Sequence, residues 1–144
     1  MRHAGSIAPM ALLLFGCSLA GCTQTTGPGP AAVIVATEPT GTLVVSWTIE
    51  LHADRNACAA AAVSTVRVHL TTAGGSDGGT YEEVCPAFST SIDLVPATYQ
   101  GTAVLLDAMG AARTSPVPLQ AFTILGGDVI TTPVDFTVTT FMPN

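Results

Sequence analysis

Alternation of apolar and polar residues along residues 43–52 constrains the fold of this chain more than any other feature. Side chains of a β-strand point to opposite faces with a period of two, so this segment predicts a half-buried strand with Trp47 near its middle. Two later segments, residues 66–70 and 134–138, repeat the pattern. The side chains predicted to face inward are Leu43, Val45, Trp47, Ile49 and Leu51 in the first strand, Val66, Val68 and Leu70 in the second, and Val134, Phe136 and Val138 in the last.

Glycine and proline recur in the segments between these strands. Only residues 53–62 have helix propensity. That stretch is too short for an isolated helix, so we expect a loop with one helical turn there. Residues 71–79 are predicted to form a flexible hairpin tip, and residues 31–36 a first short strand. Pro116 and Pro118 remove backbone donors from one side of the extended stretch at 113–124, which predicts an edge strand or a bulge. About seven or eight strands at ~10–12-residue spacing predict an all-β, antiparallel two-sheet sandwich.

The sequence LVPATY at residues 94–99 resembles the L-x-P-G-x-Y turn of Ig-like, fibronectin-III-like and transthyretin-like sandwiches, with Ala97 in place of the usual glycine. In those domains the tyrosine caps a corner between the two sheets through its hydroxyl. The resemblance implies an Ig-like or transthyretin-like sandwich over residues 33–144, with Tyr99 as a structural corner residue. The alternative is that Tyr99 is an ordinary core aromatic.

The N-terminal region has a positive charge at Arg2, followed by an apolar run over residues 7–20. That run is too short for a membrane-spanning helix, which needs ~20 apolar residues, and it fits a secretory signal peptide. The run ends in Leu19-Ala20-Gly21-Cys22, which resembles the lipobox of bacterial lipoproteins at all four positions.

The lipobox resemblance implies that a peptidase cleaves between Gly21 and Cys22 and that Cys22 carries the lipid of the mature chain. Residues 1–21 are then the signal peptide, residues 22–32 a lipidated N-terminus and flexible tether, and residues 33–144 the sandwich domain. Thr23 does not resemble the acidic inner-membrane retention signal, so we expect lipid anchoring in the cell envelope, at the outer membrane. Two alternatives remain, an ordinary signal peptide followed by an incidental cysteine and an uncleaved anchor helix.

Cys58 and Cys85 are the only cysteines after Cys22. Disulfides persist in exported proteins, and two cysteines allow one pairing, so we expect a Cys58–Cys85 disulfide. Two free thiols and a metal pair are the alternatives, although no histidine lies at zinc-site spacing from either cysteine.

The charge balance and the sequence motifs disfavour several classes of partner and reaction. The chain has 10 acidic and 4 basic residues and no lysine, which disfavours nucleic acid as a partner because such a surface repels phosphate. Residues 74–78 match G-x-S-x-G around Ser76, but no helix follows and no histidine lies downstream, so we expect no serine nucleophile. His52 and His69 are predicted on outward faces, as exposed polar residues or as a weak metal pair. We expect no catalytic residue, no resident metal and no cofactor.

The sequence thus predicts a membrane-anchored envelope lipoprotein with a non-catalytic β-sandwich module that binds, spaces or supports something at the envelope. Its expected partners are the membrane, through the lipid, and an envelope protein or a glycan. One alternative is a carbohydrate- or peptide-binding module that uses the loops near residues 52–60 and 72–79. The other is an enzyme with an unrecognised site, which would require titratable groups that converge in a cleft.

Overall fold

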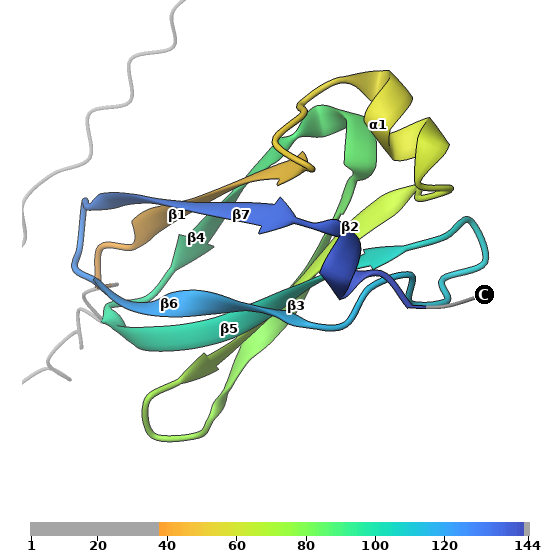
Figure 1. Cartoon of the computed structure of the whole chain (residues 1–144). Helices are drawn as coiled ribbons and strands as arrows, with labels where there is room; N and C mark the ends of the chain where they lie inside the picture. The colour runs from red at the N-terminus through yellow and green to blue at the C-terminus, as the bar shows by residue number, and fades with distance from the viewer. Residues whose placement is uncertain (1–37, 143–144) are drawn as a thin grey trace, which may run out of the picture. The chain divides into compact units, whose positions relative to one another are not determined.

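The computed structural model describes residues 38–142 (Figure 1). The predicted signal peptide, Cys22, the tether and the predicted strand at residues 31–36 lie outside the described residues. The elements in chain order are β1 (Gly41–Ile49), α1 (Arg55–Ala60), β2 (Thr65–Thr72), β3 (Asp77–Val84), the 3-10 helix η1 (Cys85–Ala87), β4 (Ser89–Leu94), β5 (Ala97–Leu106), β6 (Val117–Ile124), β7 (Val129–Phe136) and the 3-10 helix η2 (Val138–Thr140).

The seven described strands form two layers, a three-stranded sheet in the order β4-β1-β7 and a four-stranded sheet in the order β3-β2-β5-β6 (Figure 1). This arrangement confirms the predicted two-sheet sandwich. The pairs are antiparallel except β1–β7, which is parallel, with Thr42 opposite Val129 and Ile49 opposite Phe136. The turn after β6 brings the chain back to the end where β1 begins, so β7 must run in the same direction as β1.

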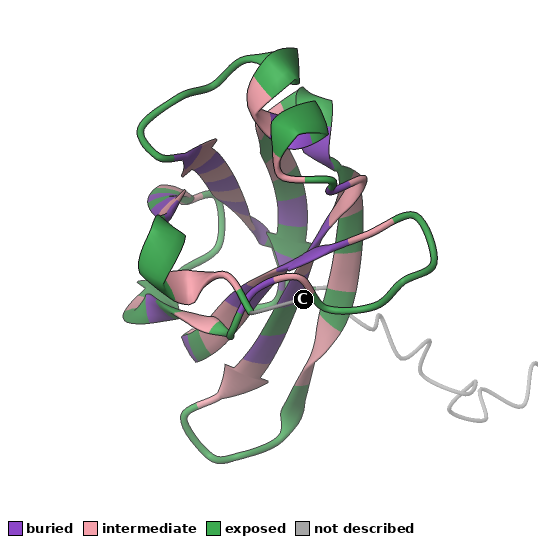
Figure 2. Ribbon diagram, turned by 45° about the vertical axis from the view of Figure 1, so that its right-hand side comes forward, coloured by how far each residue is buried: buried purple, intermediate pink, exposed green. Residues whose placement is uncertain are grey.

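The core lies between the two sheets, and purple buried residues recur along the strands in Figure 2. The predicted inward faces are confirmed for every member except Leu51 and Val138. Trp47 and Phe136, on neighbouring strands of the three-stranded sheet, are among the largest side chains that are almost fully buried. Complete burial of one such side chain stabilises the fold by roughly 1.5–3 kcal/mol, which explains why the alternating pattern dictates these faces.

Leu51 is 81% exposed, so its predicted inward position is wrong. The strand ends at Ile49, and residues 50 and 51 have positive φ angles of 53° and 65°. Such a turn reverses the chain and breaks the period of two. The apolar side chain of Leu51 therefore continues the sequence pattern but not the strand.

The predicted inward position of Val138 is also wrong, because that side chain is 67% exposed. Strand β7 ends at Phe136, and the chain then forms η2 at Val138–Thr140. The hydroxyl of Thr140 donates to the carbonyl of Thr137 at 2.7 Å and helps to close this turn. A 3-10 turn has a period of three, so the alternation that holds in β7 no longer places side chains.

Residues 71–79 are less loop-like than predicted. Strand β2 continues to Thr72 and strand β3 already begins at Asp77. Only a short turn therefore lies between them, and Gly75 in this turn has a φ of 81°. At the other side of the same sheet, β6 is an edge strand that contains Pro118, which confirms the edge prediction. The edge strand β7 carries Pro133 in the same way, and prolines at edges discourage pairing with other chains.

Candidate functional site

The two ends of the sandwich are built from different segments of the chain. The described chain enters at one end, where the Gly127 N–H donates to the Thr40 carbonyl and the Thr42 N–H donates to the Asp128 carbonyl. Strand β1 then crosses the domain over nine residues, a length of about 27 Å at ~3.3 Å per residue. At its far end the turn after β1, helix α1 and η2 come together (Figure 1). The candidate site lies at this far end.

The turn after β1 is a tight two-residue reversal centred on Glu50 and Leu51. The N–H of Ile49 donates to the His52 carbonyl at 3.0 Å, and the His52 N–H donates back to the Ile49 carbonyl at 2.9 Å. Reciprocal bonds around two residues with positive φ are the geometry of a type I′ turn, which normally uses Asn and Gly. Asp135 stabilises this one, since its Oδ1 accepts from the Thr48 hydroxyl at 2.6 Å and from the Leu51 N–H at 3.0 Å.

An apolar hollow of about 370 Å³ opens beside this turn, and we call it the end hollow. Its volume lies at the lower end of the range of small-ligand sites. Small alanine side chains on the α1 side leave the space open, and Phe141 bounds it on the other side. The lining residues are Ile49, Glu50, His52, Ala57, Ala60, Ala61, Val138 and Phe141.

Helix α1 forms one wall of the end hollow, and two devices hold this six-residue helix in place. Asp54 caps its N-terminus by accepting from the N–H groups of Asn56 and Ala57 at 2.8 and 3.0 Å. The predicted disulfide is present between Cys58 of α1 and Cys85 of η1, both buried, with a Cα–Cα distance of 6.1 Å. A helix this short is not stable alone, so the wall depends on these contacts.

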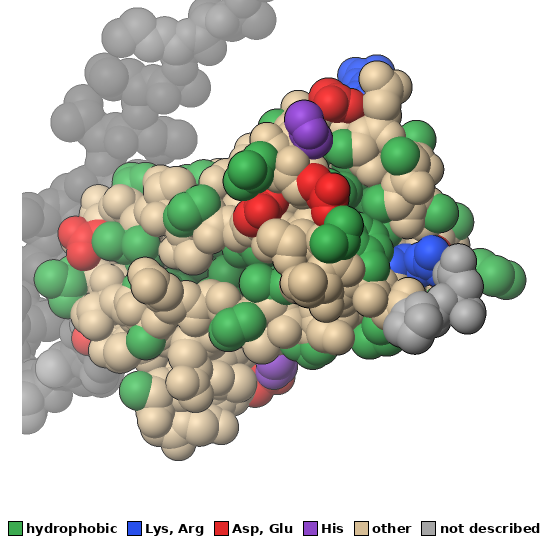
Figure 3. Space-filling view, in the orientation of Figure 1, with side chains coloured by type: hydrophobic (Ala, Val, Ile, Leu, Met, Phe, Trp, Pro, Cys, Tyr) green, Lys and Arg blue, Asp and Glu red, His purple; other side chains and the backbone are tan. Residues whose placement is uncertain are grey.

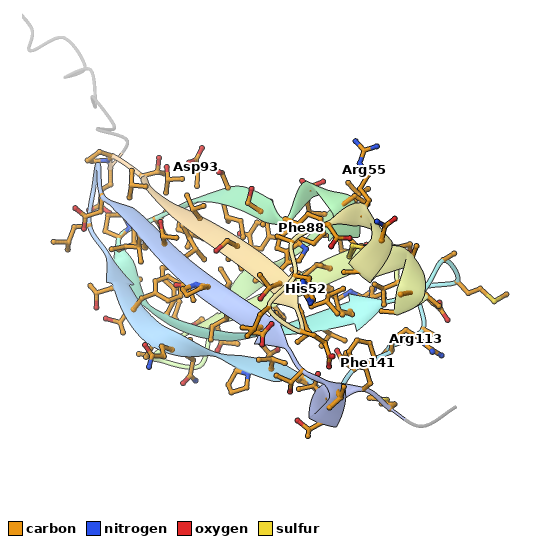
Figure 4. The ribbon with its side chains drawn as sticks, turned by 45° about the horizontal axis from the view of Figure 1, so that its top comes forward. His52, Arg55, Phe88, Asp93, Arg113 and Phe141 are labelled. Atoms are coloured by element: carbon orange, nitrogen blue, oxygen red, sulfur yellow. A yellow bond between two sulfur atoms is a disulfide. The ribbon has the colours of Figure 1, made fainter. Side chains whose placement is uncertain are left out.

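Trp47 lies at the base of the same region. Its indole Nε1–H donates to the Cys85 carbonyl at 3.0 Å, a buried bond that connects β1 to the disulfide. A second hollow of about 440 Å³, lined partly by Trp47, Leu51 and Phe88, lies on the other side of the turn. Figure 4 labels His52, Phe88 and Phe141 in this part of the domain, whereas Asp93 lies toward the opposite end.

Glu50 and His52 are the ionisable members of the end-hollow lining. Both are exposed, and within residues 38–142 the Glu50 carboxylate makes no hydrogen bond or ion pair. In Figure 3, acidic side chains and a histidine lie next to hydrophobic side chains on the face near α1. The site therefore combines an apolar floor with a solvated negative charge at its mouth.

Tyr99 lies where the chain crosses from β4 in one sheet to β5 in the other. Its side chain is buried, and its hydroxyl donates to the Val95 carbonyl at 2.9 Å. Its ring stacks on Phe122 with centroids 5.8 Å apart. Burial raises the pKa of the Tyr99 phenol above its ordinary value, and Tyr81 adds to that rise. These contacts stabilise the corner between the sheets and do not reach the end hollow.

The fold does not place Ser76, His52 and His69 in one site. Ser76 lies in the β2–β3 turn, where its N–H donates to the Thr72 hydroxyl at 3.1 Å. The Nδ1 atom of His69 is 3.1 Å from the Thr80 hydroxyl, whereas His52 follows a strand of the other sheet. Across residues 38–142, no group of three or more His, Cys, Asp or Glu side chains gathers as metal ligands would.

The end hollow was not predicted as a site, although the loop near residues 52–60 was named as a binding loop. Its lining comes from β1, the turn, α1 and the C-terminal segment, which are distant in sequence. The alanine-rich stretch at residues 57–62, interrupted by Cys58, is the available signal, because small residues on one helix face leave room beside it. In the described part of the chain, no helix has the length and hydropathy needed to cross a membrane.

No protein-family model and no curated protein sequence matches this chain. Among solved structures, the chain is similar to one from Bacteroides thetaiotaomicron described as "putative polysaccharide binding proteins (DUF1812)". The two share 10% sequence identity, and the match covers 65% of this chain and 46% of the other, with a TM-score of 0.39. This chain therefore spans less than half the length of that neighbour.

Proposed function

We propose that this chain is a lipoprotein of the bacterial cell envelope, anchored through Cys22, and that its sandwich is a non-catalytic module that binds a partner there. The observation that carries the proposal is the match of Leu19-Ala20-Gly21-Cys22 to the lipobox at the end of an apolar run. Stable membrane attachment needs more than one acyl chain, and a triacylated cysteine supplies that. Thr23 supports sorting to the outer membrane.

The described domain supports this proposal in two ways. A buried disulfide fits an oxidising compartment, which an exported protein reaches. The described chain enters the domain at the end opposite to the end hollow, so the end hollow is clear of the point where the described chain begins. An apolar hollow with a few polar groups at its mouth is the common form of a binding site.

Fatty-acid labelling tests the anchor. Cells that express the full chain are grown with an alkyne fatty-acid analogue, and the protein is then isolated and probed. The wild type and Cys17→Ser should both be labelled, because Cys17 lies inside the apolar run and not at the cleavage site. Cys22→Ser should lose the label and retain the higher mass of the uncleaved chain. Equal labelling of Cys22→Ser and the wild type contradicts the proposal, and membrane fractionation of the wild type tests the outer-membrane location.

A glycan is the second candidate partner, because the half-buried rings of Phe141 and Phe88 line the end hollow and the second hollow, respectively. Sugar binding depends on ring faces open enough for stacking, and every aromatic side chain within residues 38–142 is buried or half-buried. That placement favours a polypeptide partner over a glycan. Isothermal titration calorimetry of the full chain, with envelope oligosaccharides in one series and peptides in the other, distinguishes a glycan partner from a polypeptide partner.

A further inference from the structure

The end hollow has the shape and polarity of a receptor for a long amphipathic side chain. Its floor consists of alanine, isoleucine, valine and phenylalanine side chains, and its volume is about 370 Å³. Lysine and arginine place their methylene stems along such apolar surfaces while their charged heads remain in water. Glu50 and His52, both exposed, are the ionisable residues of the lining, so the Glu50 carboxylate is available to such a cationic head.

The charge of the domain favours a cationic occupant. The part of the chain that the structure describes holds all ten acidic residues and three arginines, with no lysine. Arg55 points away from the domain at the outer side of α1, and Arg113 lies beside Phe141, but neither is a lining residue of the end hollow (Figure 4). A negative surface attracts positive partners and accelerates their association.

The end hollow is also held in shape before any ligand binds. Asp135 accepts one hydrogen bond from the Thr48 hydroxyl of β1 and one from the Leu51 N–H of the turn, and the disulfide joins α1 to η1. A preformed site avoids much of the entropy cost of ordering loops when a ligand binds. The geometry therefore suits a small anchor from a partner chain better than a large flat surface.

We propose that the end hollow binds a single arginine or lysine side chain of a partner polypeptide, with the stem on the apolar floor and the cationic head paired with Glu50. This inference rests on the proposed binding role of the domain. It makes the polypeptide, and not a glycan, the partner at this site. Because all of the lining residues lie within the described domain, the inference does not depend on lipidation at Cys22.

A matched pair of peptides tests the proposal. The intact chain is kept in solution in a non-ionic detergent, which carries no net charge and serves whether or not the chain is lipidated, with detergent alone as the blank. The probe is a fluorescein-labelled six-residue peptide with one arginine flanked by leucines, and its partner has citrulline, a neutral isostere, in place of arginine. Fluorescence anisotropy measures the two dissociation constants. An exposed ion pair is worth ~0.2–1 kcal/mol, so arginine should bind about 1.4- to fivefold more tightly, and any smaller difference counts as equal binding.

Two pairs of protein variants locate the binding. Glu50→Gln should remove the difference between the arginine and citrulline peptides, whereas Glu38→Gln, the same change at the opposite end, should retain it. Ala60→Leu fills the end hollow and should abolish binding, whereas Ala59→Leu, on the same helix but outside the lining, should not. Trp47 emission confirms that each variant is folded.

Four results overturn the proposal. They are equal binding of the two peptides to the wild type, no binding of the arginine peptide at millimolar concentration, a preserved arginine preference in Glu50→Gln, and unchanged binding in a folded Ala60→Leu. Failure of the lipid-anchor proposal would be seen separately, as fatty-acid labelling of Cys22→Ser equal to that of the wild type.

Discussion

Removal of the Cys58–Cys85 disulfide should have the largest effect on stability of any change considered for this domain. The two cysteines are 27 residues apart in sequence, and both are buried. The chain-entropy treatment assigns a loop of that size roughly 3.5 kcal/mol of stabilisation, because the cross-link restricts the unfolded chain. That amount is a large fraction of the 5–15 kcal/mol that typically stabilises a domain.

Removal of the disulfide should also loosen helix α1 locally. Helix α1 has six residues, and its covalent link to the rest of the fold beyond the backbone is Cys58. Without the disulfide, the last turn of α1 should open more often than the strands, because only non-covalent contacts then hold it: the Asp54 cap, the packing of Ala57 and Ala61 on the core, and the contacts with η1. The amides of α1 should then exchange with solvent faster than those of β1 or β5.

Urea denaturation and amide hydrogen exchange measure the two effects. The double variant Cys58→Ala/Cys85→Ala should lose about 3.5 kcal/mol of unfolding free energy, which corresponds to a midpoint shift of roughly 1–3 M urea. Wild-type protein reduced with dithiothreitol serves as the control and should match the variant. A loss below about 1 kcal/mol would refute the entropy argument. Uniform acceleration of exchange in α1 and the strands would refute the local one.

Three further predictions concern Tyr99, at the corner between the sheets, and Ser76, in the β2–β3 turn. Tyr99→Phe should lower the unfolding free energy by about 1 kcal/mol in urea titrations, because it deletes the hydrogen bond to the Val95 carbonyl. Burial raises the pKa of Tyr99, so the stability that its neutral phenol contributes is present below pH ~10 and is lost as the pH rises through the folded-state value; Tyr99→Phe should reduce this alkaline loss. The full chain should not hydrolyse generic esters above the buffer rate, and Ser76→Ala should change nothing, since a true nucleophile would lower turnover by several orders of magnitude when removed.

The strands were predictable because one physical rule, burial of one face, sets both their sequence and their packing. Trp47 and Phe136 satisfy that rule, and Pro118 marks an edge because a proline cannot donate to a neighbouring strand. The parallel direction of β1 and β7 was not predictable, because alternation indicates which face is buried and not which strand lies beside it. The end hollow was missed for a related reason, since no local pattern shows that residues near 50, 60 and 140 meet.

Leu51 was misplaced because its positive φ is unusual for a leucine, and that geometry has an energetic consequence. A left-handed conformation costs a non-glycine residue roughly 1–2 kcal/mol. Glycine removes this cost but loses about 0.5–1 kcal/mol through the greater freedom of the unfolded chain. Because the side chain is 81% exposed, little burial is lost, and the N–H that donates to Asp135 is retained. Leu51→Gly should therefore raise the unfolding free energy by about 0.5–1 kcal/mol.

Leu125→Gly is the matched control for this prediction. Leu125 is also exposed, at 60%, and lies in a turn at the other end of the sandwich, but its φ is not positive. The same substitution there relieves no strain and should lower the unfolding free energy by about 0.5–1 kcal/mol. The two variants should thus differ by roughly 1–2 kcal/mol in urea denaturation, in opposite directions from the wild type. Equal effects would show that the turn after β1 stores no strain in Leu51.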